Sequence, residues 1–136
     1  MKFSFAYTRL YVNDYDACLH FYQDILGLKV IMTSSVDRYA ELTTGETKLS
    51  IMCRGKVKEY FGNHTPVSFG TKDDAIAISF SVKDIDEACK ALQEQKVEIV
   101  SSPWNFGDWG VKLALVRDPE GNLIELMQEG EMVGAE

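Results

Sequence analysis

The chain has 136 residues, of which 46% are hydrophobic and 26% charged, and its formal net charge is −7. This length predicts one domain, or two small units that share a core, and the acidic balance argues against nucleic-acid binding because no basic stripe is present to neutralise phosphates. No apolar run approaches the ~20 residues of a membrane span, and Met1-Lys2-Phe3 leads straight into a strand-like segment, so we expect a cytoplasmic protein with no membrane contact.

The first half of the chain predicts a strand, a helix and three further strands. Residues 5–12 form the first strand, with the even-numbered side chains on the face that packs. Asp14 is placed to cap a helix whose apolar residues are spaced for burial, and Gly27 supplies the left-handed residue that ends it. The three strands that follow are predicted at residues 28–34, 38–44 and 47–53.

Residues 55–73 connect the two halves and are rich in glycine. The segment is long for a connection inside a compact domain. It is either a linker with a small satellite cluster, or a functional flap in which Val57, Tyr60 and Phe61 form one helical turn over a cavity. We interpret it as a linker.

The second half repeats the first. A strand is predicted at 75–82, a helix capped by Asp84 follows, and "RDPEGN" forms a turn before the last strand. The strands after this helix are predicted at residues 97–102, 111–117 and 122–128.

The two halves also align residue by residue. "YVNDYDAC" at 11–18 matches "SVKDIDEAC" at 81–89, and "LSIM" at 49–52 matches "IELM" at 124–127. We therefore expect two repeats, at about 3–54 and 74–129, each too small to bury a good core alone.

The cysteines are predicted to be reduced. Cys18, Cys53 and Cys89 are odd in number and show no C-x-x-C spacing. Cys18 and Cys89 fall within helical patterns, where a reduced cysteine behaves as a small apolar residue. Neither disulfides nor a cysteine-based zinc site is expected.

The "HFYQDILGL" segment at 20–28, the closing "WGVKLALVRDPEGNLIEL" at 109–126 and the paired units resemble the vicinal oxygen chelate superfamily. This superfamily includes glyoxalase I, bleomycin resistance proteins and extradiol dioxygenases, and the resemblance covers nearly the whole chain. It implies an α+β fold for residues 1–136, in which two βαβββ units form half-open curved sheets around a concave cleft. The helices are then expected on the convex face.

Strand alternation assigns side chains to the two faces of these sheets. Ile124 and Leu126 are expected on the helix side, and Glu125 on the cleft side. Tyr7 and Arg9 are expected on the cleft side of the first strand. The other residues assigned to the cleft face are Ser50, Met52, Ala75, Ala77, Ser79 and Lys112.

The resemblance also allows a test for a metal. Metal-dependent members place four ligands, usually His or Gln, Glu, His and Glu, at positions that correspond here to Tyr7, Ser50, Ala77 and Glu125. Only Glu125 is an ordinary ligand, and a phenol with a hydroxyl cannot replace the missing imidazoles and acids. His20 lies on the first helix and His64 in the connecting segment, so we expect no metal and no cofactor.

Three aromatic residues follow one another closely in "SPWNFGDWG" at 102–110: Trp104, Phe106 and Trp109. We expect an exposed loop next to a strand, in which large apolar groups left in water would forgo their burial energy. The segment is either a stacking wall for a flat aromatic ligand, or a plug in which Trp109 fills a sheet edge or a dimer interface. Ligand contact is favoured for Trp104, and both interpretations stay open for Trp109.

Bleomycin resistance proteins bind their drugs without metal chemistry, in grooves lined by aromatic and acidic residues, and the predicted cleft resembles such a groove. Arg9 and Lys112, which also point into it by alternation, leave the charge of the ligand open. The aromatic and acidic residues predicted to line the groove are Tyr7, Tyr39, Glu41, Trp104, Phe106, Trp109 and Glu125.

Three classes of function stay open. One is a binding protein that sequesters or carries a small aromatic molecule, for which a cationic, antibiotic-like compound is one candidate. Another is a glyoxalase-type lyase or isomerase, or a dioxygenase-like enzyme, with a degenerate metal site or with Glu125 as a base. The third is a protein–protein module. The missing ligand set favours binding over metal catalysis, and a homodimer is expected because half-open sheets leave edges that need covering.

The role of Glu125 follows from the same argument. A carboxylate that is partly removed from water needs a partner, and without a metal the candidates are Arg9, an amide or a hydroxyl such as that of Tyr7, or a cationic ligand group. We expect Glu125 to be an ionised, hydrogen-bonded fixture rather than a metal ligand or a base.

Overall fold

The computed structural model describes residues 1–2, 5–61, 76–106 and 111–129, without the side chains of residues 57, 58, 60, 61 and 106. The chain forms two compact units, Met1–Thr71 and Lys72–Glu136. Each unit is described here by itself.

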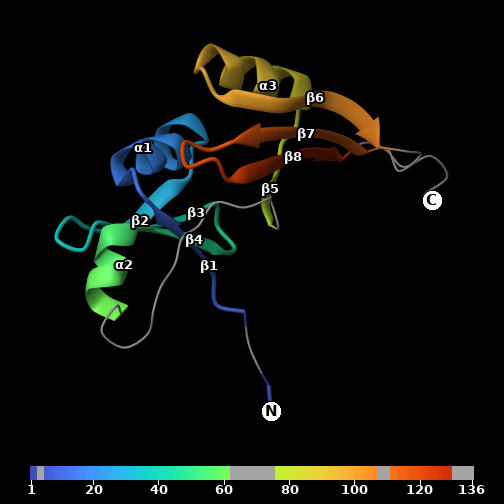
Figure 1. Cartoon of the computed structure of the whole chain (residues 1–136). Helices are drawn as coiled ribbons and strands as arrows, with labels where there is room; N and C mark the ends of the chain where they lie inside the picture. The colour runs from blue at the N-terminus through green and yellow to red at the C-terminus, as the bar shows by residue number, and fades with distance from the viewer. Residues whose placement is uncertain (3–4, 62–75, 107–110, 130–136) are drawn as a thin grey trace. The chain divides into compact units, whose positions relative to one another are not determined.

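The first unit is a four-stranded sheet with one helical segment between its first two strands (Figure 1). The strand order is β1-β4-β3-β2; β1 runs parallel to β4, and the other neighbours are antiparallel. The elements are β1 (Thr8–Val12), α1 (Tyr15–His20), η1 (Phe21–Ile25), β2 (Lys29–Ser34), β3 (Tyr39–Thr43) and β4 (Lys48–Cys53).

The helix of the first unit begins and ends where the sequence predicts, but its middle differs. Asp14 caps α1 by accepting a hydrogen bond from the backbone N–H of Ala17 at 3.0 Å, and Gly27 adopts a φ of 81°. The sequence predicts one continuous α-helix to this point, whereas residues Phe21–Ile25 form a π-helix, η1. This wider turn accompanies burial of two consecutive rings, since Phe21 and Tyr22 are 2% and 0% exposed and meet edge to face.

The core of the first unit lies between this helix and one face of the sheet. Buried residues alternate along β3, as expected for a strand covered on one side, whereas Leu49–Met52 of β4 are buried on both faces. Fully buried residues on this face and on the helix are Val12, Cys18, Tyr22, Ala40, Leu42 and Ile51.

The second unit repeats the arrangement. Its strand order is β5-β8-β7-β6, again with one parallel pair, β5 with β8, and α3 lies along the sheet (Figure 1). Asp84 caps α3 through the N–H of Glu87 at 3.0 Å. The elements are β5 (Ala77–Ser81), α3 (Ile85–Glu94), β6 (Glu98–Phe106), β7 (Val111–Arg117) and β8 (Leu123–Glu129).

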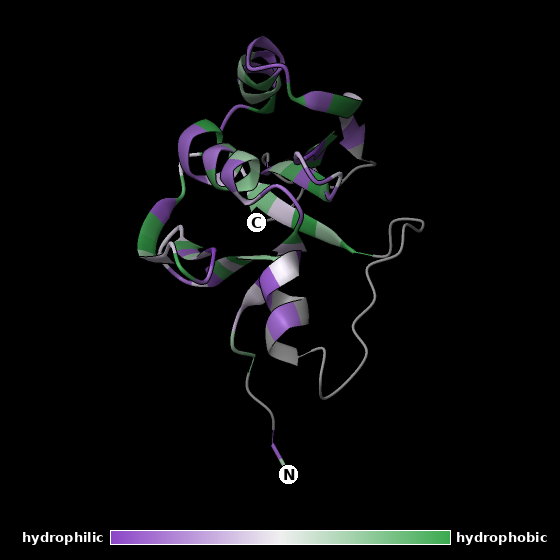
Figure 2. Ribbon diagram, turned by 60° about the vertical axis from the view of Figure 1, so that its left-hand side comes forward, coloured by the Kyte–Doolittle hydropathy of each residue, from purple (hydrophilic) through white to green (hydrophobic). Residues whose placement is uncertain are grey.

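The core of the second unit matches that of the first. Hydrophobic and hydrophilic residues alternate around α3 (Figure 2), which buries Ile85, Cys89 and Leu92. Ala114, Val116 and Ile124 are 0% exposed and form the sheet side of this core. In each unit, the apolar core thus lies on the side of the sheet that faces the helix.

Strand β6 corrects one expectation. The sequence predicts a strand that ends at residue 102 and an exposed loop that carries Trp104, whereas β6 continues to Phe106 and Trp104 is half-buried on it. Pro103 is tolerated because β6 is the edge strand of its sheet, and the β6–β7 register shifts between Ser101 and Trp104.

The segment that connects the units begins as a helix, α2 (Arg54–Phe61), which is longer than the single turn considered from the sequence. Residues 62–75, including His64, lie outside the described part of the chain. Among the described helices, none has the length and apolar character needed to cross a membrane.

Each unit is therefore a βαβββ motif with an open sheet, and the predicted α+β fold is confirmed. The two units also share an ion pair at an equivalent place. Arg38, just before β3, contacts Asp16 at 3.0 Å in the first turn of α1, and Lys112, on β7, contacts Asp86 at 2.7 Å in the first turn of α3. Both pairs tie the first turn of a helix to the third strand of its own unit.

Candidate functional site

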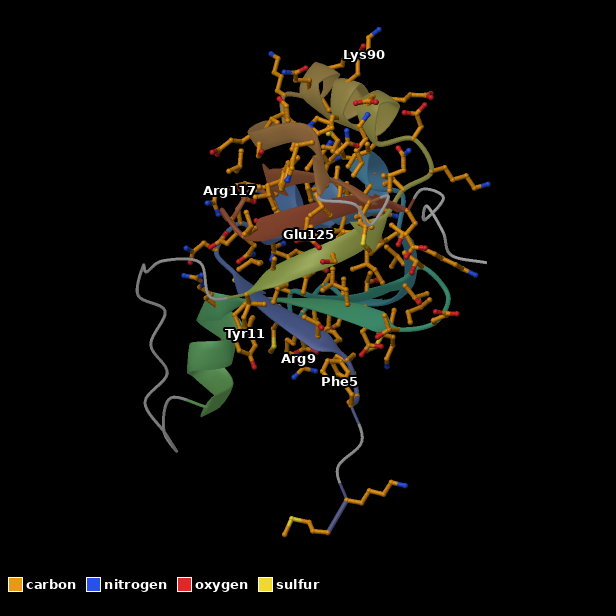
Figure 3. The ribbon with its side chains drawn as sticks, turned by 90° about the vertical axis from the view of Figure 1, so that its right-hand side faces the viewer. Phe5, Arg9, Tyr11, Lys90, Arg117 and Glu125 are labelled. Carbon is orange, nitrogen blue, oxygen red and sulfur yellow. The ribbon has the colours of Figure 1, made fainter. Side chains whose placement is uncertain are left out.

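The sheet face of the first unit that is turned away from α1 carries a network of hydrogen bonds around Arg9. Nε of Arg9 donates to Oγ of Ser50 at 3.0 Å, and Nη2 donates to the hydroxyls of Tyr7 and, at 3.4 Å, of Tyr39. Arg9 comes from β1 (Figure 3) and itself is exposed, whereas Ser50 on the neighbouring strand is 0% exposed. The guanidinium is thus held at three points.

The backbone register explains why these residues meet. Arg9 lies opposite Ser50 in the β1–β4 pairing, and Ser50 lies opposite Glu41 in the β3–β4 pairing. Residues that pair directly share a face of the sheet. The predictions that Tyr7, Arg9 and Ser50 share one face are confirmed.

Met52 belongs to the same face. It lies opposite Tyr39 in β3 and Tyr11 in β1, two positions along from Ser50. Its side chain is 8% exposed, so it forms part of the apolar support of the face.

Glu41 has both carboxylate oxygens engaged. The Tyr39 hydroxyl donates to Oε2 at 2.5 Å, and Nζ of Lys48 lies 3.3 Å from Oε1. The hydrogen bond from Tyr39 is the main cause that lowers the pKa of Glu41 below its ordinary range, and Lys48 lowers it further. Glu41 is therefore an ionised carboxylate, and its negative charge is largely compensated by Tyr39 and Lys48.

The pKa of Tyr39 moves in the opposite direction. Burial, followed by the hydrogen bond to Glu41, raises the pKa of this phenol to about 12. Tyr39 is thus a neutral donor across the physiological pH range.

The pKa of Arg9 is also raised. Partial burial works against its charge, but the hydrogen bond to Tyr39 and the favourable electrostatic interactions with Tyr7 and Tyr39 outweigh it. Arg9 thus remains a permanent cation.

The cationic side chains of this face lie over tyrosine rings. The guanidinium carbon of Arg9 lies 5.1 Å from the centre of the Tyr7 ring and 5.5 Å from that of Tyr39, and Nζ of Lys48 lies 4.8 Å from the Tyr7 ring centre. Such contacts add cation–π attraction to the hydrogen bonds. We call the six residues Tyr7, Arg9, Tyr39, Glu41, Lys48 and Ser50 the Arg9 cluster.

The corresponding face of the second unit carries Glu125. Oγ of Ser79 donates to Oε1 of Glu125 at 2.7 Å, from the position directly opposite in the β5–β8 pairing. Glu125 comes from β8 (Figure 3) and lies opposite Leu115, while Leu113 lies opposite both Met127 and Trp104. By register, Trp104 is therefore on the same face as Glu125, although the sequence placed it in a loop rather than on a strand.

The predicted position of Lys112 on the cleft face is wrong. Simple alternation assigns it to the cleft face, but its ammonium contacts Asp86 on α3, and its register partner Gln128 accepts a hydrogen bond from the N–H of Ile85 at the start of α3. Lys112 thus shares the helix side with Ala114 and Val116. The error arose because a solvated lysine at the end of a strand does not reveal its face by hydropathy, whereas the buried residues that follow it do.

Several predicted residues fall outside what the structure describes. These are Ala75, Trp109 and the side chain of Phe106, whose backbone pairs with Val111 at the end of β6. His20 is described; it is exposed on α1 and its Nδ1 lies 2.8 Å from Asp24, as expected for a helix-surface side chain.

The sequence did not predict the contribution of Lys48 or the contact that Ser79 makes with Glu125. Lys48 is two positions before Ser50 in β4, so alternation places it on the same face, but it was not assigned to that face from the sequence. Ser79 was assigned to the cleft face, but its pairing with Glu125 depends on the register of two strands that are distant in the sequence.

With this geometry established, comparison with known proteins identifies the family. The family model for the glyoxalase/bleomycin resistance protein/dioxygenase superfamily matches residues 4–126. The chain belongs to this superfamily.

Relatives within the superfamily agree over nearly full lengths. The uncharacterized protein YraH of Bacillus subtilis (strain 168) is 32% identical over 118 residues, which cover 87% of this chain and 92% of YraH. A probable lactoylglutathione lyase of Synechocystis sp. (strain ATCC 27184 / PCC 6803 / Kazusa) is 28% identical, over 90% of this chain and 92% of its own.

A solved structure supports the fold. The crystal structure of a glyoxalase/bleomycin resistance protein/dioxygenase from Nocardioides superposes with a TM-score of 0.76 at 18% identity, and covers 96% of this chain and 86% of that one. At this identity the likeness concerns the fold.

Superfamily membership raises the question of a metal, and the residues present do not fit one. At the ligand positions of the first unit, Tyr7 and Ser50 both accept hydrogen bonds from the guanidinium of Arg9, which is itself a cation. In the second unit, Ala77 offers no donor atom and Glu125 is one carboxylate. In the described ranges, no three His, Cys, Asp or Glu side chains come together as a metal site.

Proposed function

We propose that this superfamily member is a metal-independent binding protein for a small aromatic molecule. The Arg9 cluster of the first unit is one surface to which we assign ligand contact. The Glu125 face of the second unit, with Trp104, is the other. Both present polar groups that are already fixed by neighbours, together with aromatic surface, which is the usual make-up of a small-molecule site.

One observation carries this proposal. The guanidinium of Arg9 donates to both residues, Tyr7 and Ser50, that stand at the superfamily's metal-ligand positions in the first unit. A divalent cation beside this guanidinium would meet like charge and only neutral oxygen donors, so a metal is disfavoured on electrostatic grounds. Ligand recognition must then rest on the side chains themselves.

The alternative function is a lyase of the glyoxalase type. It is favoured by the relatives named lactoylglutathione lyase or probable lactoylglutathione lyase, which are 27–29% identical to this chain. On this alternative, Glu125 would act on the substrate either as a metal ligand or as a base.

A paired experiment separates the two functions. The purified protein is stripped with EDTA and assayed for conversion of the glutathione–methylglyoxal hemithioacetal into lactoylglutathione, alone and with Zn²⁺, Ni²⁺, Mn²⁺ or Fe²⁺. The same stripped protein is screened by thermal shift against aromatic compounds, including aromatic antibiotics, because a ligand that is selective for the native state raises its melting temperature. We expect thermal shifts in EDTA and no turnover with any metal. Metal-dependent turnover that disappears in Glu125→Ala would overturn the proposal.

A further inference from the structure

We propose that the Arg9 cluster binds the carboxylate of an aromatic monoanion, with Arg9 taking the role of the positive centre of the site. This inference rests on the proposed binding function and names its ligand class. The sequence left the charge of the ligand open, with a cationic compound as one candidate, and this inference selects an anion instead.

The first argument concerns the donors that remain. Of the guanidinium nitrogens of Arg9, Nε is engaged by Ser50, and Nη2 by Tyr7 and Tyr39. The Arg9 side chain also has a hydrogen bond with Tyr11, which contributes to its raised pKa, and Arg9 is exposed on this face. The five N–H groups of a guanidinium exceed the four hydroxyl partners Ser50, Tyr7, Tyr39 and Tyr11, so a further oxygen acceptor can bind the exposed guanidinium.

The second argument concerns charge. Arg9 and Lys48 are cations, Glu41 is the single carboxylate of the cluster, and Tyr39 stays neutral, so the cluster carries one net positive charge. Glu41 cannot serve as an anionic anchor for a ligand without giving up Tyr39 or Lys48. One net positive charge matches a monoanion, whereas a dianion would be left partly unneutralised next to Glu41.

The third argument concerns geometry. A planar guanidinium held by three hydrogen bonds is preorganised, so little conformational entropy is lost when it binds a further acceptor. Guanidinium–carboxylate hydrogen bonds are charge-assisted and stronger than neutral ones. The rings of Tyr7 and Tyr39, which flank the guanidinium, supply apolar surface for an aromatic group attached to the carboxylate.

The test uses three ligands of one shape and different charge. Binding of 2-naphthoate, 2-naphthamide and 2-naphthamidinium is measured by calorimetry in EDTA, on the wild type and on Arg9→Met. We expect 2-naphthoate to bind at least about tenfold more tightly than the amide, and the amidinium to bind most weakly. In Arg9→Met the three affinities should converge.

The matched control is Arg38→Met, which removes the same charge from the helix-side pair with Asp16. It should keep the preference for 2-naphthoate. Tyr7→Phe, which deletes one hydroxyl, should weaken 2-naphthoate by a smaller factor than Arg9→Met, and urea unfolding of each variant shows whether it is folded. A 2-naphthyl phosphate arm separates the two kinds of oxyanion, because tighter binding of the phosphate would overturn the assignment to a carboxylate.

The outcomes are distinguishable. If 2-naphthamide or the amidinium binds as tightly as 2-naphthoate, the anion inference is wrong and the aromatic-binding function stands. If Arg38→Met loses the preference for 2-naphthoate as completely as Arg9→Met does, the preference comes from the net charge of the protein and not from Arg9. The inference is then also wrong. If none of the naphthalene ligands binds, the proposed function itself fails for the Arg9 cluster.

Discussion

Ser79 donates a hydrogen bond to Glu125 at 2.7 Å, between residues that lie directly opposite each other on β5 and β8. The carboxylate therefore has a hydroxyl partner within its own unit. A hydroxyl was among the partners expected from the sequence, but Tyr7 was the example considered. Arg9, the other candidate, is engaged by Ser50, Tyr7 and Tyr39.

Replacing Ser79 with alanine should cost little stability. A hydrogen bond to a charged group is worth about 1.5–3 kcal/mol when buried, but this one is exposed and water can replace the hydroxyl, so we expect a loss below about 1 kcal/mol in the free energy of unfolding. Urea unfolding measures it, with Ser81→Ala on the same strand as the control. A loss of several kcal/mol would show that Glu125 is far less hydrated than its exposure indicates.

The Tyr39 phenol should titrate unusually late. Its pKa of about 12, against an ordinary value of 10.0, means that the native state holds this proton more tightly than the unfolded chain does. The resulting stabilisation is fully present below pH 10 and is lost as the pH rises towards about 12. Ultraviolet titration of tyrosinate should show this late phenol in the wild type but not in Tyr39→Phe, while Tyr15→Phe, which deletes a different raised phenol, should keep it.

The contribution of Glu41 to the stability of the folded state should be lost at acid pH, in contrast to that of Tyr39. Its lowered pKa contributes stability above the ordinary carboxyl range, and this contribution is lost as the pH falls through the folded-state pKa. Carbon-detected NMR titration should find the pKa of Glu41 raised in Tyr39→Phe, because the Tyr39 hydroxyl is the main cause of the lowering. Lys48→Met should raise it by less. A larger shift in Lys48→Met would mean that the ion pair, not the phenol, stabilises this carboxylate.

The sequence was sufficient to predict the fold because local signals agreed with one another. Asp14 and Asp84 cap the two helices as predicted, and the alternation of Ile124, Glu125 and Leu126 gave the faces of the last strand correctly. These signals depend on neighbours in the sequence, so an isolated segment already contains them.

The candidate site was less predictable because it depends on strand register and on side chains with ambiguous faces. Lys112 was assigned to the wrong face, and the roles of Lys48 and Ser79 emerge only when distant strands pair. Trp104 was expected in a loop because Pro103 and the glycines that follow suggest a break, whereas an edge strand accommodates a proline. In each case tertiary context decided what local composition left open.

We expect the protein to form a homodimer. Each sheet leaves edge strands unpaired within its unit, and apolar side chains on the edge strands β2 and β6 are exposed, with Ile31 at 45%, Met32 at 47% and Val100 at 44%. Sedimentation equilibrium at micromolar concentration should give twice the chain mass. Val100→Lys should shift the equilibrium towards monomer if β6 takes part, with Lys90→Ala on α3 as the control. A wild-type mass of one chain would contradict the prediction.

Trp104 should contribute to ligand binding more than to folding. It lies near the end of the edge strand β6, it is half-buried, and its register partner Leu113 places it on the face of Glu125. Stacking of a flat ring on an aromatic side chain is worth roughly 1–3 kcal/mol, so Trp104→Ala should weaken binding of an aromatic ligand about tenfold or more. Because this position is at a sheet edge and already partly hydrated, the same change should lower the urea midpoint only modestly. The test compares ligand titration and urea unfolding for Trp104→Ala and Trp104→Phe, where the phenylalanine variant keeps a ring and should recover much of the affinity. If affinity stays at the wild-type level in Trp104→Ala while the urea midpoint falls sharply, Trp104 is a structural residue of β6.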